Sequence, residues 1–326
     1  MALMTDRAPR GAVLLADIGG TNSRFAVPGP DGRPEQMLIV ENDTVGSLED
    51  AITHYLDATG ARPRAAVLAI AGPLDGGEEI AMTNRAWRFR RGELARRFGF
   101  TKLYVLNDFE AIAWSLTRLA ATDARPLGPV LPARAGVKAV LGPGTGLGVA
   151  ALVPVDGGWQ VLASEGGHAS FGAQAPDEME IFARLWRERG IVSAETILSG
   201  PGLPRLLQAI DPSSPAQTPE AVVAAALADA PAAQQAARLF VRMLGRFAGN
   251  LALTFTAVGG IYVAGGVVSR LGPLFDDQAF RAAFEAHPPQ EKLLRSIPTF
   301  LMHRTEPGLL GCAALADQLA ISDAPA

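Results

Sequence analysis

Glycine-rich turns and clustered polar side chains mark the parts of this sequence that could carry a reaction. In the segment 16–27, "ADIGGTNSRFAV", Gly19, Gly20 and Thr21 follow an apolar run and stand just after Asp17. Glycines let backbone N–H groups approach phosphate oxygens closely, and a threonine hydroxyl adds a donor. The Asp17 carboxylate could serve Mg²⁺ or its water shell. The turn therefore predicts a nucleotide phosphate site, with a plain β-hairpin turn as the alternative.

The glycine spacing excludes two common nucleotide fingerprints. The sequence has no G-x-G-x-x-G, and no lysine follows the glycines as in G-x-x-x-x-G-K-[ST]. The pattern of the segment 16–27, an apolar run, a glycine turn and a second apolar run, occurs again in "KAVLGPGTGLGVAALV" (138–153). There Gly144, Thr145 and Gly146 separate the two apolar runs. Two copies of strand, glycine turn and strand predict a duplicated architecture with a phosphate-holding turn in each half.

Asp108 is the candidate general base. It follows the apolar run 102–106 and precedes a helical pattern of apolar residues, Phe109, Ile112, Leu116 and Leu119. Phosphoryl transfer needs a carboxylate that accepts the proton of the attacking hydroxyl, and α/β folds place ligands at the carboxyl ends of strands. The alternative for Asp108 is an N-cap of the helix that follows.

Three further polar residues suit a ligand with many hydroxyl groups. Glu165 and His168 flank two glycines in "SEGGHASFG" (164–172), and Glu195 follows in "VSAETILSG". Carboxylates and an imidazole can bond several hydroxyls at once. A metal site at Glu165 and His168 is rejected, because no third ligand stands at useful spacing.

The sequence lacks the residues that several other kinds of site require. No G-x-S-x-G elbow appears, so no serine triad can be argued. Cys312 is the only cysteine, which excludes an intramolecular disulfide and a cysteine-based zinc site. It lies in an apolar helical pattern and is interpreted as a packing residue.

The elements that position these residues alternate between strand and helix, which favours an α/β fold. Strands are predicted on both sides of each glycine turn and at 65–72, 102–106 and 261–266. Thr218 is the predicted N-cap of a helix that begins at Pro219. A longer helix buries a stripe of Phe240, Leu244, Phe247, Leu251 and Phe255, and a short apolar helix covers 308–320.

Charge and composition limit the classes of binding partner that the sequence predicts. The formal charge of −4 and the 48% hydrophobic content give no reason to expect nucleic acid or an anionic membrane. The basic stretch 85–97 is interpreted as a solvated helix face, and glycines and prolines interrupt the nearly uncharged stretch 139–155, so no membrane helix is expected. Residues 1–11 are interpreted as a tail without the apolar core of a signal peptide. A single cysteine suits the cytoplasm.

The motifs, taken in order, resemble one family. "LLADIGGTNSRFAV", "AIAGP", "AMTNRAW", "LNDFEAIA", "GPGTGLGVA", "SEGGHASF", "VSAETILSGPGL", "GRFAGNLAL" and "IYVAGGVV" occur in the order seen in bacterial glucokinases, ATP-dependent enzymes of the hexokinase/actin-like superfamily. The resemblance runs from about residue 14 to about residue 311. It implies transfer of the γ-phosphoryl group of Mg-ATP to the 6-hydroxyl of glucose, the first step of glycolysis.

The resemblance also assigns roles to residues of this sequence. Asn107 and Asp108 are expected to contact the sugar, with Asp108 as the base, and Glu165, His168 and Glu195 to bind sugar hydroxyls. Asp17 is expected to hold Mg²⁺ through water. The residues expected to hold ATP are Asp17, Gly19, Gly20, Thr21, Asn22, Gly144, Thr145, Gly146, Ala264, Gly265 and Gly266.

The fold implied by the resemblance is a duplicated actin-like, ribonuclease-H-like two-domain α/β fold with a ligand cleft between a small and a large domain. The small domain is expected over residues 1–120, completed by the helix at 308–326, and the large domain over 121–307. Members of the family are commonly homodimers, so a cytoplasmic homodimer is expected.

Other functions stay open at this point. A kinase for fructose, mannose or an amino sugar would keep most of these motifs, and an ATP-binding regulator or actin-like assembly protein would keep the nucleotide turns. The related repressor and sugar-kinase branch carries a cysteine-rich zinc motif and an N-terminal helix-turn-helix, and this sequence has neither. A dinucleotide oxidoreductase is disfavoured, because the glycine spacing is wrong and no acidic residue follows at the expected strand end.

Overall fold

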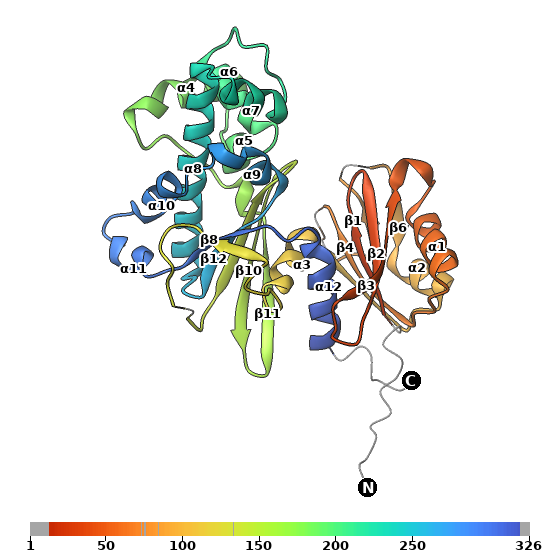
Figure 1. The fold of residues 1–326 in the computed structure, drawn as a ribbon. Helices are drawn as coiled ribbons and strands as arrows, with labels where there is room; N and C mark the ends of the chain where they lie inside the picture. Colours follow the sequence, from red (N-terminus) through yellow and green to blue (C-terminus); the bar gives the residue numbers. More distant parts are fainter. Residues whose placement is uncertain (1–12, 73, 75, 84, 133, 320–326) are drawn as a thin grey trace. The chain divides into compact units, whose positions relative to one another are not determined.

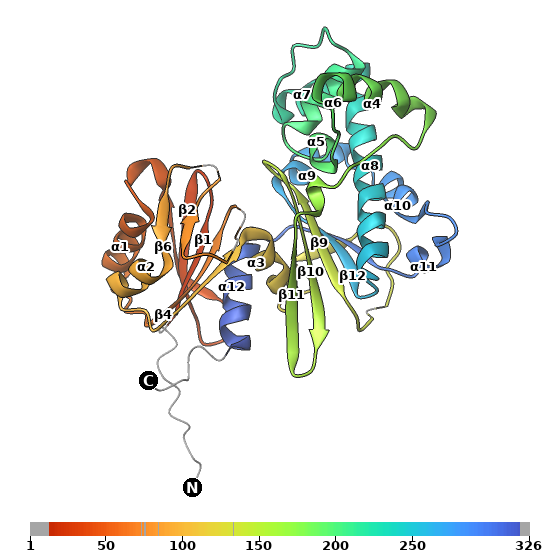
Figure 2. The same ribbon diagram turned by 180° about the vertical axis from the view of Figure 1, so that it is seen from behind.

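The computed structural model describes residues 13–72, 74, 76–83, 85–132 and 134–319, which form two compact units (Figures 1 and 2). Unit 1 comprises the described residues of 1–119, 155–161 and 305–326, and unit 2 comprises those of 120–154 and 162–304. The grouping of 155–161 with unit 1 is a feature that the sequence pattern does not predict. The tail at 1–11 and the outer domain limits at residues 1 and 326 lie outside the described residues.

Unit 1 is a sheet with helices on both faces. The strand order is β3–β2–β1–β4–β7, with β1, β4 and β7 parallel and β2 antiparallel to β1. Almost every residue of β1 and β4 is buried, as expected for parallel strands covered on both sides. The strands are β1 (Val13–Ile18), β2 (Asn22–Pro28), β3 (Pro34–Glu41), β4 (Ala65–Ile70) and β7 (Lys102–Asn107), and a small ribbon contains β5 (Glu79–Ala81) and β6 (Arg88–Arg90).

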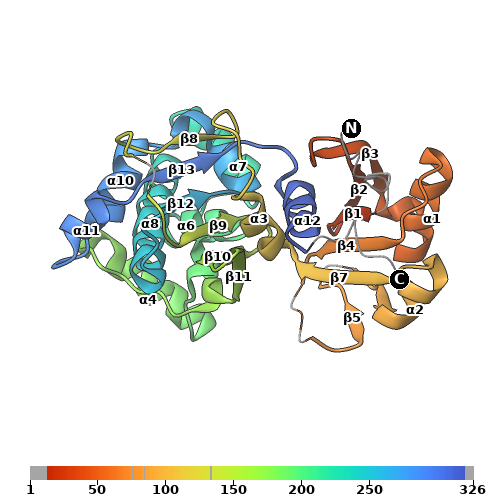
Figure 3. The ribbon, with the colours of Figure 1, turned by 90° about the horizontal axis from the view of Figure 1, so that it is seen from below.

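The helices of unit 1 divide between the two faces of this sheet. Figure 3 shows α1 and α2 on one face and α3 and α12 on the other. α3 and α12 cross so closely that a Cβ atom on Gly311 would overlap the carbonyl oxygen of Ala111. The bounds are α1 (Leu48–Thr59), α2 (Arg91–Phe98), α3 (Asp108–Ser115) and α12 (Pro307–Gln318).

The second sheet repeats the plan of the first. Its order is β11–β10–β9–β12–β13–β8; β9 and β10 are antiparallel, whereas β9, β12 and β13 are parallel. The first five strands match β3–β2–β1–β4–β7 in order and direction, which confirms the predicted duplication. The strands are β8 (Ala124–Pro126), β9 (Lys138–Pro143), β10 (Leu147–Val155), β11 (Gly158–Ser164), β12 (Gly260–Val263) and β13 (Thr299–Met302).

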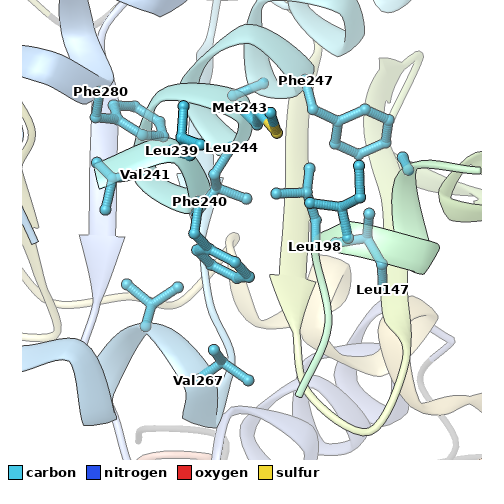
Figure 4. Packing of buried hydrophobic residues seen from close by; sticks show 14 of the residues in the cluster. Leu147, Leu198, Leu239, Phe240, Val241, Met243, Leu244, Phe247, Val267 and Phe280 are labelled. Carbon is cyan, nitrogen blue, oxygen red and sulfur yellow. The ribbon is translucent and has the colours of Figure 1, made fainter. Parts of the chain in front are cut away.

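The helices of unit 2 surround the long helix α8 (Pro231–Phe255). Phe240, Leu244, Phe247 and Leu251 are buried as predicted, and Phe255 is half-buried. Figure 4 shows how this helix packs with residues from the neighbouring elements. The predicted cap is also present, since the Thr218 side chain accepts a hydrogen bond from the N–H of Ala221. The other helices are α4 (Pro176–Arg189), α5 (Ala194–Ile197), α6 (Gly202–Ile210), α7 (Pro219–Leu227), α9 (Gly266–Leu271), α10 (Asp277–Glu285) and α11 (Glu291–Arg295), and the short 3₁₀ turns are η1 (Asn42–Thr44), η2 (Gly166–His168) and η3 (Gly272–Leu274). In the part of the chain that the structure describes, no helix has the length and apolarity to cross a bilayer.

Two expectations about helices are wrong. The helix after Asp108 ends at Ser115 and does not reach Leu119. The hydroxyls of Ser115 and Thr117 donate to backbone carbonyls three residues earlier, and the backbone continues with tighter i to i−3 bonds. The basic stretch 85–97 is likewise not one helix face, because it contains a loop and strand β6 before α2 begins at Arg91.

Candidate active site

The first glycine turn joins β1 to β2 in unit 1. The N–H of Gly19 donates to the carbonyl of Asn22 at 3.0 Å, which closes the turn, and Thr21 is exposed at its tip. Two residues outside the turn hold its backbone. The Asn42 amide donates to the carbonyls of Gly19 at 2.8 Å and Gly20 at 3.3 Å, and its own Oδ1 accepts from a serine hydroxyl.

Arg85 adds a second support from the loop before β6. Its guanidinium donates to the carbonyl of Gly20 at 3.2 Å and to the carbonyl of Asn42 at 2.5 Å. In a trans peptide the C=O and the following N–H point in opposite directions. Because the carbonyls of Gly19 and Gly20 are held by Asn42 and Arg85, the N–H groups of Gly20 and Thr21 are directed to the opposite side. Such a row of fixed N–H groups is a concave site for an anion.

Asn42 and Arg85 are the residues that sequence reasoning missed. Arg85 was expected on a solvated helix face, but its side chain is only 18% exposed and serves the turn. Asn42 is completely buried, and no local pattern marks it. Its place directly after the strand residues 34–41 is the only signal in the sequence, and it does not distinguish this role from an ordinary turn.

Asp108 lies at the same sheet edge as the glycine turn. The register pairs Ile18 with Ile70 and Ile70 with Asn107, so the carboxyl ends of β1, β4 and β7 are level. Two strand spacings of ~4.8 Å put the ends of β1 and β7 about 10 Å apart. This spacing brings the turn and the candidate base to one edge of unit 1.

The cap of α3 is Asn107, so the alternative role of Asp108 as N-cap is wrong. Asn107 Oδ1 accepts from the N–H of Phe109 at 2.8 Å, and the Glu110 carboxylate accepts from the N–H of Asn107, also at 2.8 Å, in a capping box. Asn107 Nδ2 also donates to the carbonyl of Gly72 at 2.9 Å. Asp108 is the first helical residue, is half-exposed, and accepts from the N–H of Phe109 at 2.9 Å.

Asp17 lies at the end of β1, next to the start of α12. A Cβ on Gly308 would stand 2.7 Å from Asp17 Oδ2, so only glycine lets the helix pass this carboxylate. Burial raises the pKa of Asp17, Arg24 opposes this, and the negative charge of Glu306 adds to it. A divalent cation would favour the charged form, and carboxylate oxygens are the donors that Mg²⁺ prefers. The residues present therefore fit a magnesium ion.

The second glycine turn, in unit 2, is held by its neighbours. The N–H of Gly144 donates to the carbonyl of Gly146 at 2.8 Å, and the carbonyl of Gly144 accepts from Gly200 at 2.7 Å. Glu195 accepts from the N–H of Leu147 at 2.8 Å, and a Cβ on Gly146 would overlap its carboxylate. A larger residue at Gly146 would therefore displace the Glu195 carboxylate from the turn. Thr145 lies at the tip and is exposed.

The segment Ala264–Gly266 lies beside that turn, because β12 pairs with β9. The N–H of Ala264 donates to the carbonyl of Leu141 at 2.8 Å. Gly265 has a φ of 98°, and a Cβ there would overlap the carbonyl of Pro143. The close approach of the two backbones thus depends on glycine.

Glu165, His168 and Glu195 gather in unit 2, as the sequence predicts for a common ligand. His168 Nε2 lies 3.7 Å from Glu165, and His168 Nδ1 lies 3.9 Å from Glu195. These distances are longer than hydrogen bonds, and the side chains of His168 and Glu165 are 61% and 71% exposed. Their polar atoms can therefore reach hydroxyls of a ligand. Within the described residues, no group of three or more His, Cys, Asp or Glu side chains is arranged to hold a metal.

Known proteins resemble this chain in sequence and in fold. A family model described as Glucokinase matches residues 14–319. A glucokinase of Chromobacterium violaceum is 42% identical over 96% of this chain and 92% of its own, and one of Paramagnetospirillum magneticum is 40% identical over 93% and 97%.

Solved structures agree with these relatives. A glucokinase from an Antarctic psychrotroph is 30% identical, with a TM-score of 0.85 over 93% of this chain and 98% of its own. A glucokinase from Balamuthia mandrillaris, solved in complex with glucose, is 27% identical, with a TM-score of 0.75 over 93% and 92%.

Proposed function

The chain belongs to the glucokinase family, and from this we propose that it transfers the γ-phosphoryl group of ATP to the 6-hydroxyl of glucose, with Asp108 as the general base. One observation carries the assignment of the base. The carboxylate of Asp108 and the anchored turn at Gly19–Thr21 stand at one edge of the same sheet. In addition, Asn107 and not Asp108 is the N-cap of α3.

Each residue has a defined task in this proposal. The N–H groups of Gly20 and Thr21 bind phosphate oxygens of ATP, and the turn Gly144–Gly146 and the segment Ala264–Gly266 hold the rest of the nucleotide. Asp108 receives the proton of the attacking hydroxyl, which leaves the oxygen free to attack phosphorus.

The sugar is held by side chains that can bond several hydroxyls. Glu165 and Glu195 accept hydrogen bonds from hydroxyls, and His168 either accepts or donates. The Asn107 amide uses one hydrogen toward the carbonyl of Gly72 and has a second for the sugar. Glucose bound to the related structure from Balamuthia mandrillaris supports a sugar as the acceptor.

Asp17 would hold magnesium through water, with Asn22 and the turn nearby. When bound, the ion neutralises charge on the transferred phosphoryl group. Asp17 would hold the ion at the end of β1, where Gly308 leaves room for its carboxylate beside α12.

The test is the release of ADP from Mg-ATP with glucose, fructose, mannose, N-acetylglucosamine or no sugar. We expect turnover mainly with glucose. Turnover mainly with another sugar would keep Asp108 as the base and replace the acceptor. Turnover without sugar, or binding of ATP with no turnover, would favour a regulator or assembly protein.

The setting of this activity is part of the same proposal. We place the enzyme in the cytoplasm, as the first step of glycolysis, and as a homodimer, because members of the family commonly form one. Light scattering coupled to size-exclusion chromatography tests the dimer: a mass near 68 kDa, twice that of the 34.1 kDa chain, is expected.

A further inference from the structure

A buried ion pair joins two helices of unit 2. Glu178 of α4 and Arg246 of α8 meet at 2.7 Å, and their side chains are 1% and 7% exposed. Such a pair is weak evidence for stability, because apolar residues of similar size often replace one without loss. Its position therefore requires another explanation.

Both members of the pair hold the backbone of one segment, 171–174. Arg246 donates to the carbonyl of Gly172 at 2.8 Å, and its guanidinium lies 4.4 Å from the ring centre of Phe171. Glu178 accepts from the N–H of Gln174 at 2.9 Å. Two charged groups thus fix the segment at three of its four residues.

This segment continues directly from the sugar side of the site. The N–H of Ala194 donates to the carbonyl of Ala169 at 3.0 Å, and the N–H of Phe171 forms a second backbone bond with the opposite segment. His168 stands immediately before this ladder on one segment, and Glu195 immediately after it on the other. The ladder that the ion pair fixes therefore contributes to their separation of 3.9 Å, together with the hydrogen bond from the N–H of Leu147 that holds the Glu195 carboxylate.

The charges of the pair persist at neutral pH. Burial raises the pKa of Glu178, but hydrogen bonds from Arg246 and from the N–H of Gln174, together with the positive charges of Arg246 and Arg242, more than offset it, so the pKa lies below its ordinary value. Glu178 therefore carries its negative charge beside Arg246 throughout the neutral pH range.

We propose that Glu178 and Arg246 are positioning residues, which hold the segment 169–174 so that His168 and Glu195 stand at the spacing that glucose requires. This rests on the proposed function, since it takes His168 and Glu195 as sugar contacts. In this proposal the two residues contact no substrate and act through the ladder.

The main test replaces the pair by apolar residues of similar size, in the double variant Glu178→Leu with Arg246→Met. This change avoids an unpaired buried charge, so the protein is expected to fold. We expect the KM for glucose to rise about tenfold or more, since small misplacements of binding groups are costly. The KM for ATP should change less than about twofold, which is within the ordinary effect of a remote substitution. Calorimetric titration of glucose provides a readout independent of turnover.

A conservative variant distinguishes positioning from mere presence of charge. Arg246→Lys keeps a cation beside Glu178, but an ammonium lacks the planar fork that spans two acceptors and stacks on Phe171. An intermediate rise in the glucose KM is expected. If the double variant does not fold, the KM values for glucose and ATP are compared in Arg246→Lys and Glu178→Gln instead.

The matched control is Arg281 in α10, which is as buried as Arg246, with a side chain 6% exposed. It holds backbone carbonyls of Leu294 and Ile297 at 3.0 and 2.7 Å, far along the chain from the sugar residues. Arg281→Met should lower the melting temperature and leave the glucose KM unchanged.

Two results would overturn the inference: a folded double variant with the wild-type glucose KM, or an equal rise in the Arg281→Met control. Glucose binding and phosphorylation by the wild-type protein, measured in the same assays, test the proposed function separately. If it neither binds nor phosphorylates glucose, the proposed function itself fails, whatever the variants do.

Discussion

The anchoring of the first glycine turn leads to a quantitative prediction. Asn42 is completely buried, and its side chain takes part in hydrogen bonds with Gly19, Gly20 and Ser23 at 2.8, 3.3 and 2.6 Å. At ~1 kcal/mol for each bond, Asn42→Ala should lower the free energy of unfolding by about 3 kcal/mol. Denaturation in urea measures this loss.

The same substitution should weaken the binding of ATP. Without Asn42 the carbonyl of Gly19 loses its anchor, and the turn must be ordered when the nucleotide binds. If between half and all of the lost ~3 kcal/mol reappears in binding, the KM for ATP rises by about 10- to 150-fold. The KM for glucose should stay within about twofold, because remote sites are usually independent.

A control separates this effect from general loss of stability. Ser115 in α3 is also completely buried, and its hydroxyl donates to the carbonyl of Ile112 at 2.6 Å. Ser115→Ala should destabilise unit 1 without changing the KM for ATP. A folded Asn42→Ala protein with the wild-type KM for ATP would refute the reasoning that the held carbonyls direct the N–H groups.

Four further outcomes are expected. Asp108→Ala should lower kcat by about 10²- to 10⁴-fold in the ADP-release assay, with weakened sugar binding, and near-normal turnover would remove Asp108 as the base. His168→Ala should mainly raise the KM for glucose, and a rise confined to the KM for ATP would contradict its place on the sugar side. Gly265→Ala should lower the free energy of unfolding in urea by more than about 1 kcal/mol, because φ is 98° and the Cβ meets the carbonyl of Pro143. Burial, followed by the charge of Asp17, raises the pKa of the Cys312 thiol, so a thiol reagent should label it much faster in urea than in the native protein, and equal rates would show that it is accessible.

The local parts of the fold and site could be predicted from the sequence. Each glycine turn joins two adjacent strands, so apolar runs and turn residues within some 16 positions contain the whole hairpin. The cap at Thr218 with Pro219 is equally local. The same holds for the clustering of Glu165 with His168, which are three residues apart in the chain.

The supports of the site could not be predicted, because they come from distant positions. Asn42 is 23 residues from the carbonyl of Gly19, and Arg85 is 65 residues from the carbonyl of Gly20. Arg246 is 74 residues from Gly172. A pattern of charge or periodicity cannot specify such pairs, since it describes only neighbours, and for this reason Arg85 resembled an ordinary surface cation.

The packing of α12 on α3 has a consequence for the synthesis of the chain. Unit 1 needs the residues from 305 onward, and Gly311 of α12 must reach Ala111 before that face of the sheet is covered. The ribosome adds residues 120–304 in between, which takes about 10–40 s at ~5–20 residues per second. During that time the apolar strands β1 and β4 lack the cover of α12 on one side. We therefore expect the nascent chain to bind chaperones that recognise exposed apolar strands, and truncation before α12 to leave the chain in that state.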